Sequence, residues 1–164
     1  MNPVISIHLT DAEVAAIAEV EATSNILKLV TRLTSLRFAA IAKVTDQRWI
    51  ACAVMDEINF GVEPGSELDL ETTICNELRA HRTPVVISCA SKDPVYSSHP
   101  LPKRYRFESY FSVPIILADG TFFGTLCGID PLPAKLDDPD LLHTLVIFAK
   151  LIATTLDMHN RLAS

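Results

Sequence analysis

The stretch SYFSVPIILADGTFFGTLCGID, Ser109–Asp130, constrains the fold of this chain more than any other. Two runs of apolar, β-branched and aromatic residues flank Asp119-Gly120, and an Asp-Gly pair between such runs is the strongest short-range signal for a β-hairpin. Both runs are apolar at nearly every position instead of alternating, so both faces of the hairpin should be covered. We therefore expect two central antiparallel strands, with Gly124 and Gly128 marking places where a helix approaches closely.

Further elements are expected on both sides of this hairpin. Thr10-Asp-Ala-Glu13 reads as a capping box that starts a helix, and Asp138-Pro139 places an N-cap and a first-turn proline before the last one. Asp69 caps a short helix with an acidic first turn and a basic last turn, which suits the helix dipole. The expected elements are a first helix to about Leu36, strands Phe38–Thr45 and Trp49–Glu57, a loop Ile58–Leu68, a helix Glu71–His81, a strand Val85–Ser88, an irregular loop Ala90–Phe107 that has room for a helical turn, the central hairpin, and a helix from Pro139 to about Asn160.

This order predicts an α+β domain. An antiparallel sheet would lie between the terminal helices on one face and the middle segment on the other. The first helix has an apolar stripe for the sheet, listed as Val14, Ile17, Val20, Leu27, Val30 and Leu33. The 164 residues suit a single domain, with its core over about residues 12–158.

Composition restricts the partners and the compartment. Lys and Arg total 14 against 20 Asp and Glu, a net charge of -6, and there is no basic stripe, which argues against nucleic acid or an anionic membrane surface as a partner. The N-terminus lacks the pattern of a signal peptide, and no uninterrupted apolar stretch approaches the roughly 18 residues of a membrane span. We expect a cytoplasmic protein with no membrane partner.

The cysteines and acidic clusters predict no metal site. Four cysteines stand singly in apolar segments without CxxC spacing, which indicates buried, reduced thiols: Cys52, Cys75, Cys89 and Cys127. The aspartates at 137, 138 and 140 are explained by the helix dipole.

Four short motifs carry a resemblance to a known family: ETTIC at Glu71–Cys75, PVVI at Pro84–Ile87, SYFSVPI at Ser109–Ile115 and GTFFGTLCGID at Gly120–Asp130. Together with the order of elements, they resemble a GAF domain, the sensory module of bacterial signalling proteins such as histidine kinases and diguanylate cyclases. The resemblance implies a sheet of five to six antiparallel strands. It also implies a ligand pocket under the short helix and long loop, and terminal helices that pair between subunits.

Aromatic and polar residues are concentrated in the segments that would line such a pocket. Rings of this kind bind planar ligands by stacking and a few hydrogen bonds. The predicted ligand-binding residues are Trp49, Cys75, Tyr96, His99, Tyr105, Phe107, Tyr110 and Ser112. The sequence therefore predicts a noncatalytic sensory domain with an unidentified small-molecule ligand and an unknown cofactor. A kinase or cyclase output domain is a candidate partner.

Two alternatives remain open. GAF domains that bind bilins carry Cys-His in this loop, where this chain has Ser98-His99, and a hydroxyl is a far weaker nucleophile than a thiol. A bilin would therefore not be attached covalently at that position. The chain also resembles the free methionine-R-sulfoxide reductases, with Cys75 near the first cysteine of that family and Cys89 as a candidate partner, but the loop Lys92–Pro102 lacks the attacking cysteine.

The last helix predicts a homodimer. Its apolar residues form two adjacent rows, Leu141, Leu145, Phe148, Ile152 and Leu142, Val146, Ala149, Ala153, Leu156, widened by Ile147 and Leu151. One sheet face covers only a stripe of somewhat over 100° on a helix. Pairing of the terminal helices across a two-fold axis would cover the remainder.

Overall fold

One antiparallel sheet forms the centre of the domain. The structure is a computed structural model that describes residues 24–68 and 74–163, without the side chains of residues 75, 76 and 159–163. The strands are β1 (Phe38–Val44), β2 (Trp49–Asp56), β3 (Glu67–Leu68), β4 (Val85–Ile87), β5 (Ser109–Ile116) and β6 (Phe122–Asp130). The helices are α3 (Ser24–Thr34), α4 (Ile74–His81), α5 (Pro100–Tyr105) and α6 (Pro139–Ala163), with a 3-10 turn, η2 (Ala90–Lys92). The six described strands are hydrogen-bonded in the order β3-β2-β1-β6-β5-β4, which confirms the α+β prediction.

The central hairpin forms as predicted. β5 and β6 pair from Ser109 opposite Asp130 towards the turn, where Gly120 has φ of 87° and the Leu117 N–H donates to the Thr121 carbonyl at 2.9 Å. A positive φ is the conformation for which glycine is suited. β6 also pairs with β1, so the hairpin occupies the middle of the sheet.

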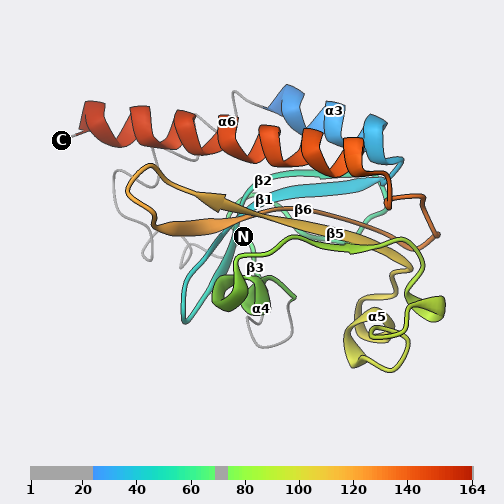
Figure 1. Ribbon diagram of the computed structural model, residues 1–164. Coiled ribbons are helices and arrows are strands. Elements are labelled where there is room, and N and C mark those ends of the chain that lie inside the picture. Colours follow the sequence, from blue (N-terminus) through green and yellow to red (C-terminus); the bar gives the residue numbers. More distant parts are fainter. Residues whose placement is uncertain (1–23, 69–73, 164) are drawn as a thin grey trace.

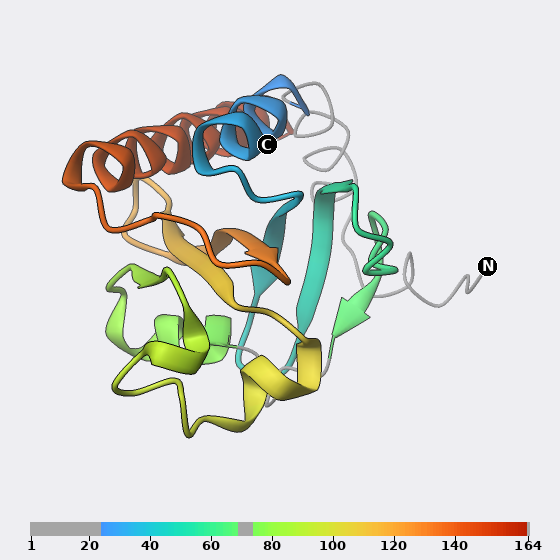
Figure 2. The same cartoon turned by 90° about the vertical axis from the view of Figure 1, so that its right-hand side faces the viewer.

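Helices cover both faces of the sheet (Figures 1 and 2). α3 and α6 lie over one face, and α4 and α5 lie on the other. Alternate residues of each strand point to opposite faces, which gives two hydrophobic cores. The core under α3 and α6 includes Leu27, Val30, Ile41, Phe111, Val113, Ile115, Leu126, Leu145, Ala149, Ile152 and Leu156. The opposite core includes Phe38, Trp49, Ile74, Ile87, Leu101, Phe107, Tyr110, Cys127 and Ile129.

A β-bulge interrupts the pairing of β1 with β2. Ile41 lies opposite Ala53 and Ala42 opposite Ala51, so Cys52 is the extra residue of the bulge. Because a bulge shifts the alternation by one residue, Cys52 and Ala53 both belong to the core under α3 and α6.

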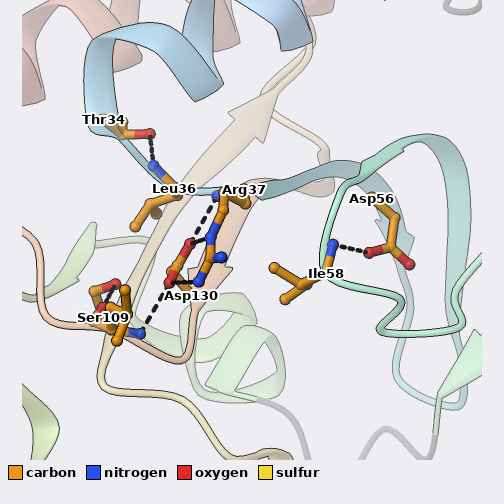
Figure 3. Close-up of polar contacts among 8 residues, drawn as sticks. Thr34, Leu36, Arg37, Asp56, Ile58, Ser109 and Asp130 are labelled. Carbon is orange, nitrogen blue, oxygen red and sulfur yellow. Dashed lines mark hydrogen bonds and ion pairs between the residues drawn. The ribbon is translucent and has the colours of Figure 1, made fainter.

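The boundaries of the first helix differ from the prediction. Its start, with the capping box and Val14, Ile17 and Val20, lies outside the described residues. It ends at Thr34 because Ser35 adopts a positive φ of 64°, and the Thr34 hydroxyl accepts from the Leu36 N–H at 3.2 Å (Figure 3). Leu33 was predicted to face the sheet, which is wrong, since it is 49% exposed.

Two expected loops contain regular structure. The segment Ile58–Leu68 ends in β3, which pairs with Trp49 and Ile50 of β2. The loop Ala90–Phe107 holds η2 and α5. The expected cap Asp69 and the start of the helix that follows it lie outside the described residues.

The prediction that a helix approaches Gly124 and Gly128 is wrong. A Cβ at Gly124 would overlap the backbone of Ala42 in the neighbouring strand. A Cβ at Gly128 would meet the rings and methyl groups of Phe111 and Leu36. Both glycines are therefore required by packing within the sheet and its core.

An ion pair between a partly exposed guanidinium and a buried carboxylate joins the residue before β1 to the end of β6 (Figure 3). The Arg37 guanidinium donates from Nε and Nη2 to the Asp130 carboxylate, both at 2.9 Å, and the Arg37 backbone N–H donates at 3.0 Å. The Leu132 N–H adds a donor at 2.8 Å. Burial raises the pKa of Asp130, but the hydrogen bonds and the charge of Arg37 outweigh this and hold the pKa below its ordinary value.

α6 has the length and composition of a membrane span over Pro139–Met158, with a mean hydropathy of 1.5. The sequence predicts no span when an uninterrupted apolar run is required, since polar residues interrupt this segment. Of this window, 28% is buried against the rest of the domain, through one stripe of residues that includes Leu145 and Ile152.

Candidate functional site

A small cavity lies on the sheet face opposite α3 and α6. Its volume is about 50 Å³. The residues around it come from five strands, from α4 and α5, and from the connections between them. They are Phe38, Trp49, Phe60, Leu68, Ile74, Leu101, Tyr105, Phe107, Tyr110, Cys127, Gly128 and Ile129.

The strands supply the floor of the cavity through their alternation. Cys127 and Ile129 are two residues apart in β6, and both point to this face. Phe38 stands opposite Ile129 in the pairing of β1 with β6, and Tyr110 stands opposite Ile129 in the pairing of β5 with β6. These side chains from three adjacent strands therefore meet at one place.

Aromatic rings close the sides. The ring centroids of Phe38 and Phe60 lie 5.0 Å apart, those of Phe60 and Tyr105 lie 5.9 Å apart, and those of Phe107 and Tyr110 lie 5.4 Å apart, all in tilted arrangements. Such geometries are favourable for aromatic pairs. The rings thus link the loop after β2 with α5 and the strand β5.

α5 forms part of the roof. The helix contributes Leu101 and Tyr105 to the cavity. Its start is capped by His99, whose Nδ1 accepts from the Leu101 N–H at 3.2 Å. Its end turns at Arg106, with φ of 58°, and the Phe107 N–H donates to the Pro102 carbonyl at 3.0 Å. The local sequence therefore directs one face of this short helix inward.

The structure brings four of the predicted ligand-binding residues to the cavity and places three others beside it. Trp49, Tyr105, Phe107 and Tyr110 line it. Tyr96, His99 and Ser112 do not, and the side chain of Cys75 lies outside the described part of the chain. As ligand contacts, all eight remain predictions.

Tyr96 and His99 form a separate polar cluster with α4. Their ring centroids lie 5.4 Å apart, and His99 Nε2 lies 3.5 Å from Glu77 Oε1. Burial raises the pKa of Tyr96, and the nearby carboxylates Glu77 and Asp93 raise it further. Ser112 is fully buried in β5 between Val85 and Cys127.

Sequence reasoning missed most of the apolar wall. Phe38, Cys127 and Ile129 could have been found, because alternation places them on the same face as Trp49 and Tyr110. Phe60, Leu68 and Leu101 carry no comparable signal. They lie on a loop, in a two-residue edge strand and on a short helix, and the placement of these segments depends on tertiary packing.

The cavity is chemically uniform. No charged side chain lines it among the described residues, and the wall is almost entirely apolar. Sites for ordinary small-molecule ligands occupy roughly 300–1,000 Å³. At about 50 Å³, this cavity holds only a few heavy atoms in the described conformation, and its wall supplies dispersion contacts instead of acid or base groups.

The described thiols lie apart from one another in the fold. Cys52 and Cys127 are buried in the cores on opposite faces of the sheet. Cys89, after β4, donates from Sγ to the Glu108 carboxylate at 3.0 Å, and Ser91 Oγ donates to the same oxygen at 2.9 Å. The bond from Cys89 contributes most to lowering the pKa of Glu108, against an opposing effect of burial. Over the described residues, no cluster of His, Cys, Asp or Glu could hold a metal ion.

Comparisons with known proteins place the chain in a family. The sequence model for the GAF domain matches residues 19–156. The chain belongs to the GAF domain family. No curated protein matches the sequence.

Solved structures resemble this GAF domain over nearly its whole length. The blue-light absorbing form of the PixJ GAF domain from Thermosynechococcus elongatus has a TM-score of 0.70 at 10% identity, covering 95% of this chain and 93% of that one. A type II free methionine-R-sulfoxide reductase from Thermoplasma acidophilum has a TM-score of 0.64 at 15% identity, covering 91% and 97%. The GAF-B domain of DevS from Mycobacterium smegmatis has a TM-score of 0.62 at 13% identity, covering 84% and 92%. At these identities the likeness shows the fold alone.

Proposed function

We propose that this GAF domain is a noncatalytic sensory module that binds a small molecule between the sheet and α5. The observation that carries the proposal is the aromatic cavity, which is built from distant parts of the chain and left incompletely filled. Protein interiors are ordinarily packed without voids larger than a water molecule. The ligand would regulate an output domain, for which a kinase or a cyclase is our candidate.

Gly128 offers a short route from the cavity to the helical face. Its backbone forms part of the cavity wall. On the other side of the sheet, the position of its absent Cβ is filled by Phe111 and Leu36, which pack under α3 and α6. A ligand that displaces β6 at Gly128 would therefore move side chains that support the helices. It changes the arrangement of the helices only if it binds one arrangement more tightly than another.

The outer faces of α3 and α6 would pass the signal to a second copy. Leu29 and Leu33 of α3 are 46% and 49% exposed. In α6, Ile147, Leu151 and Met158 are 43–58% exposed, and their spacing of four and seven residues puts them on one stripe of the helix. We propose that a homodimer covers this surface, because two such helix pairs across a two-fold axis form a four-helix arrangement.

We further propose a cytoplasmic location and no partnership with nucleic acid or membrane. The net charge of -6 disfavours polyanions. The three cysteines whose side chains are described are reduced, with no disulfide among them, as expected in a reducing compartment. The apolar length of α6 is accounted for by the stripe buried on the sheet and by the proposed dimer surface.

The absence of catalysis is likewise a proposal. It is supported by a cavity wall whose described residues offer no charged acid or base, and by the burial of Cys52 and Cys127 on opposite faces. Reduction of a sulfoxide needs an accessible thiol and a second thiol close to it.

Native mass spectrometry and an absorbance spectrum of the purified protein test the sensory proposal. We expect either a retained small molecule or a ligand that raises the melting temperature in a screen, with weaker binding in Tyr105→Ala, which alters the cavity wall. Tyr96→Ala is the matched control, because this tyrosine is also partly buried but does not line the cavity. An equal loss of binding in both variants, or no binding by any compound, contradicts the proposal. Strong visible absorbance would instead favour the bilin alternative.

A further inference from the structure

We infer that the ligand of this cavity is an uncharged, apolar molecule no larger than a single ring, admitted by outward displacement of α5. This inference rests on the proposed sensory function and names the class of ligand. It follows from three features of the cavity: its wall, its volume and the element that closes it.

The wall excludes charged ligands. None of the described lining residues is charged. The basic residues nearest in sequence, Lys103, Arg104 and Arg106, are exposed on the outside of α5, whereas Leu101 is buried towards the cavity. A phosphate or carboxylate in the cavity would lose its hydration without gaining an ionic partner, which costs several kcal/mol.

The wall favours apolar ligands, because they gain dispersion contacts there without displacing well-bound water. Water gains little against an almost entirely apolar wall, so water in this partly open cavity is weakly held. The lining atoms then lack contacts on one side, and an apolar ligand restores this dispersion energy without displacing well-bound water. Six aromatic side chains provide polarizable surface for such contacts, those of Phe38, Trp49, Phe60, Tyr105, Phe107 and Tyr110.

The volume sets the size. The cavity measures about 50 Å³, which is about a third of the roughly 150 Å³ of an engineered apolar cavity that binds benzene or xenon. Only a few heavy atoms fit the described conformation, whereas a six-membered ring requires one wall to move outward.

α5 is the wall that can move. It has six residues, and a helix this short has little stability without its tertiary contacts. Its inward contacts are those of Leu101, Pro102 and Tyr105, while its N-cap at His99 is local and can move with it. The opposite wall consists of hydrogen-bonded strands in the middle of the sheet. The pairing of β1, β5 and β6 allows a small shift at Gly128 but not an outward displacement large enough to admit a ring.

Trp49 provides a direct readout. It is the only tryptophan in the chain, it is 3% exposed, and it lines the cavity. Its emission therefore reports occupancy of this site without a label. We would titrate the protein with benzene and, in parallel, with benzoate, which has the same ring and a negative charge, and follow Trp49 emission together with backbone amide shifts.

We expect a saturable response to benzene, with shifts confined to the cavity and α5, and no response to benzoate at the same concentrations. Leu101→Phe fills the cavity and should weaken benzene binding by about tenfold, or about 1.4 kcal/mol. Leu101→Ala enlarges the cavity and should strengthen binding, even though it destabilises the fold. Opposite effects at one position cannot arise from unfolding. Leu132→Ala and Leu132→Phe are the matched controls, because Leu132 is 60% exposed and outside the cavity.

Three results would overturn the inference. Benzene binding that is unchanged in both Leu101 variants would place the site elsewhere. A response of Trp49 to benzoate or to a cyclic nucleotide but not to benzene would refute the ligand class and leave the sensory function standing. No response to any of these probes, together with no retained molecule in native mass spectrometry, would refute both.

Discussion

Replacing Asp130 with Asn should destabilise the domain in a way that depends on pH. The carboxylate is buried, with 3% of its side chain exposed, and it accepts from three groups of Arg37 and from the Leu132 N–H at 2.8–3.0 Å. An Asn side chain fits the same space, but one of its two terminal groups is a donor. At least one of these partners must then face another donor.

The magnitude follows from the number and type of bonds lost. A hydrogen bond to a charged group contributes about 1.5–3 kcal/mol, and breaking a buried ion pair costs about 3–5 kcal/mol. The Arg37 side chain is 46% exposed, so water can compensate its charge, and the lower end applies. We expect a loss of about 2–3 kcal/mol in the free energy of unfolding at neutral pH, or roughly 5–10 °C in melting temperature for a domain of this size.

The pKa of Asp130 determines how the difference in stability between the two proteins changes with pH. The pKa of Asp130 is lowered in the folded state, whereas it is about 3.9 in an unfolded chain. The stabilising contribution is therefore complete above about pH 4 and is lost as the pH falls through the folded pKa. The difference between the unmodified protein and Asp130→Asn should shrink at low pH.

Urea unfolding followed by Trp49 emission, near pH 7 and near pH 3, measures this difference. Asp46→Asn is the control, because Asp46 is exposed in the turn between β1 and β2. A difference below about 0.5 kcal/mol at neutral pH, the range of ordinary surface substitutions, would refute the reasoning, as would a difference that stays constant as the pH falls.

Three further predictions concern the dimer, the chemistry and the packing of the sheet. Light scattering should show a dimer that Leu151→Glu dissociates and Lys103→Glu does not, since Lys103 is exposed on α5, on the opposite face of the sheet. An unmodified protein that stays monomeric at about 100 μM has a self-affinity weaker than roughly −5.5 kcal/mol, which contradicts the proposal. NADPH consumption coupled to thioredoxin should show no reduction of free methionine-R-sulfoxide, and turnover near 1 per second that disappears in Cys75→Ser would make the protein an enzyme. Gly124→Ala should cost more than about 4 kcal/mol, because its Cβ would overlap the Ala42 backbone. By contrast, Gly120→Ala should cost about 1–2 kcal/mol, since it has a positive φ but open space around it; thermal unfolding followed by circular dichroism compares the two, and equal losses would be inconsistent with the packing.

The sequence by itself determined those elements that are specified by residues adjacent in the chain. The Asp119-Gly120 turn and its two apolar flanks specify the central hairpin, because the turn residue accepts the required φ and the flanks need burial on both sides. The order of helices and strands specified the α+β class. The strand motifs pointed to the family that the match over residues 19–156 establishes.

Tertiary structure alone decided which side chains share the cavity. Tyr96, His99, Tyr105 and Phe107 are all ring-bearing residues of one segment, and the sequence does not distinguish them. Tyr96 and His99 pack against each other, and His99 lies near Glu77 of α4. Tyr105 and Phe107 line the cavity. Phe60 reaches Phe38 and Tyr105 only because a loop folds back over β1 and α5. The size of the cavity likewise depends on contacts between residues far apart in sequence. Periodicity reports the face on which a residue lies, but not which distant element covers that face, because that choice is made by packing of the whole domain.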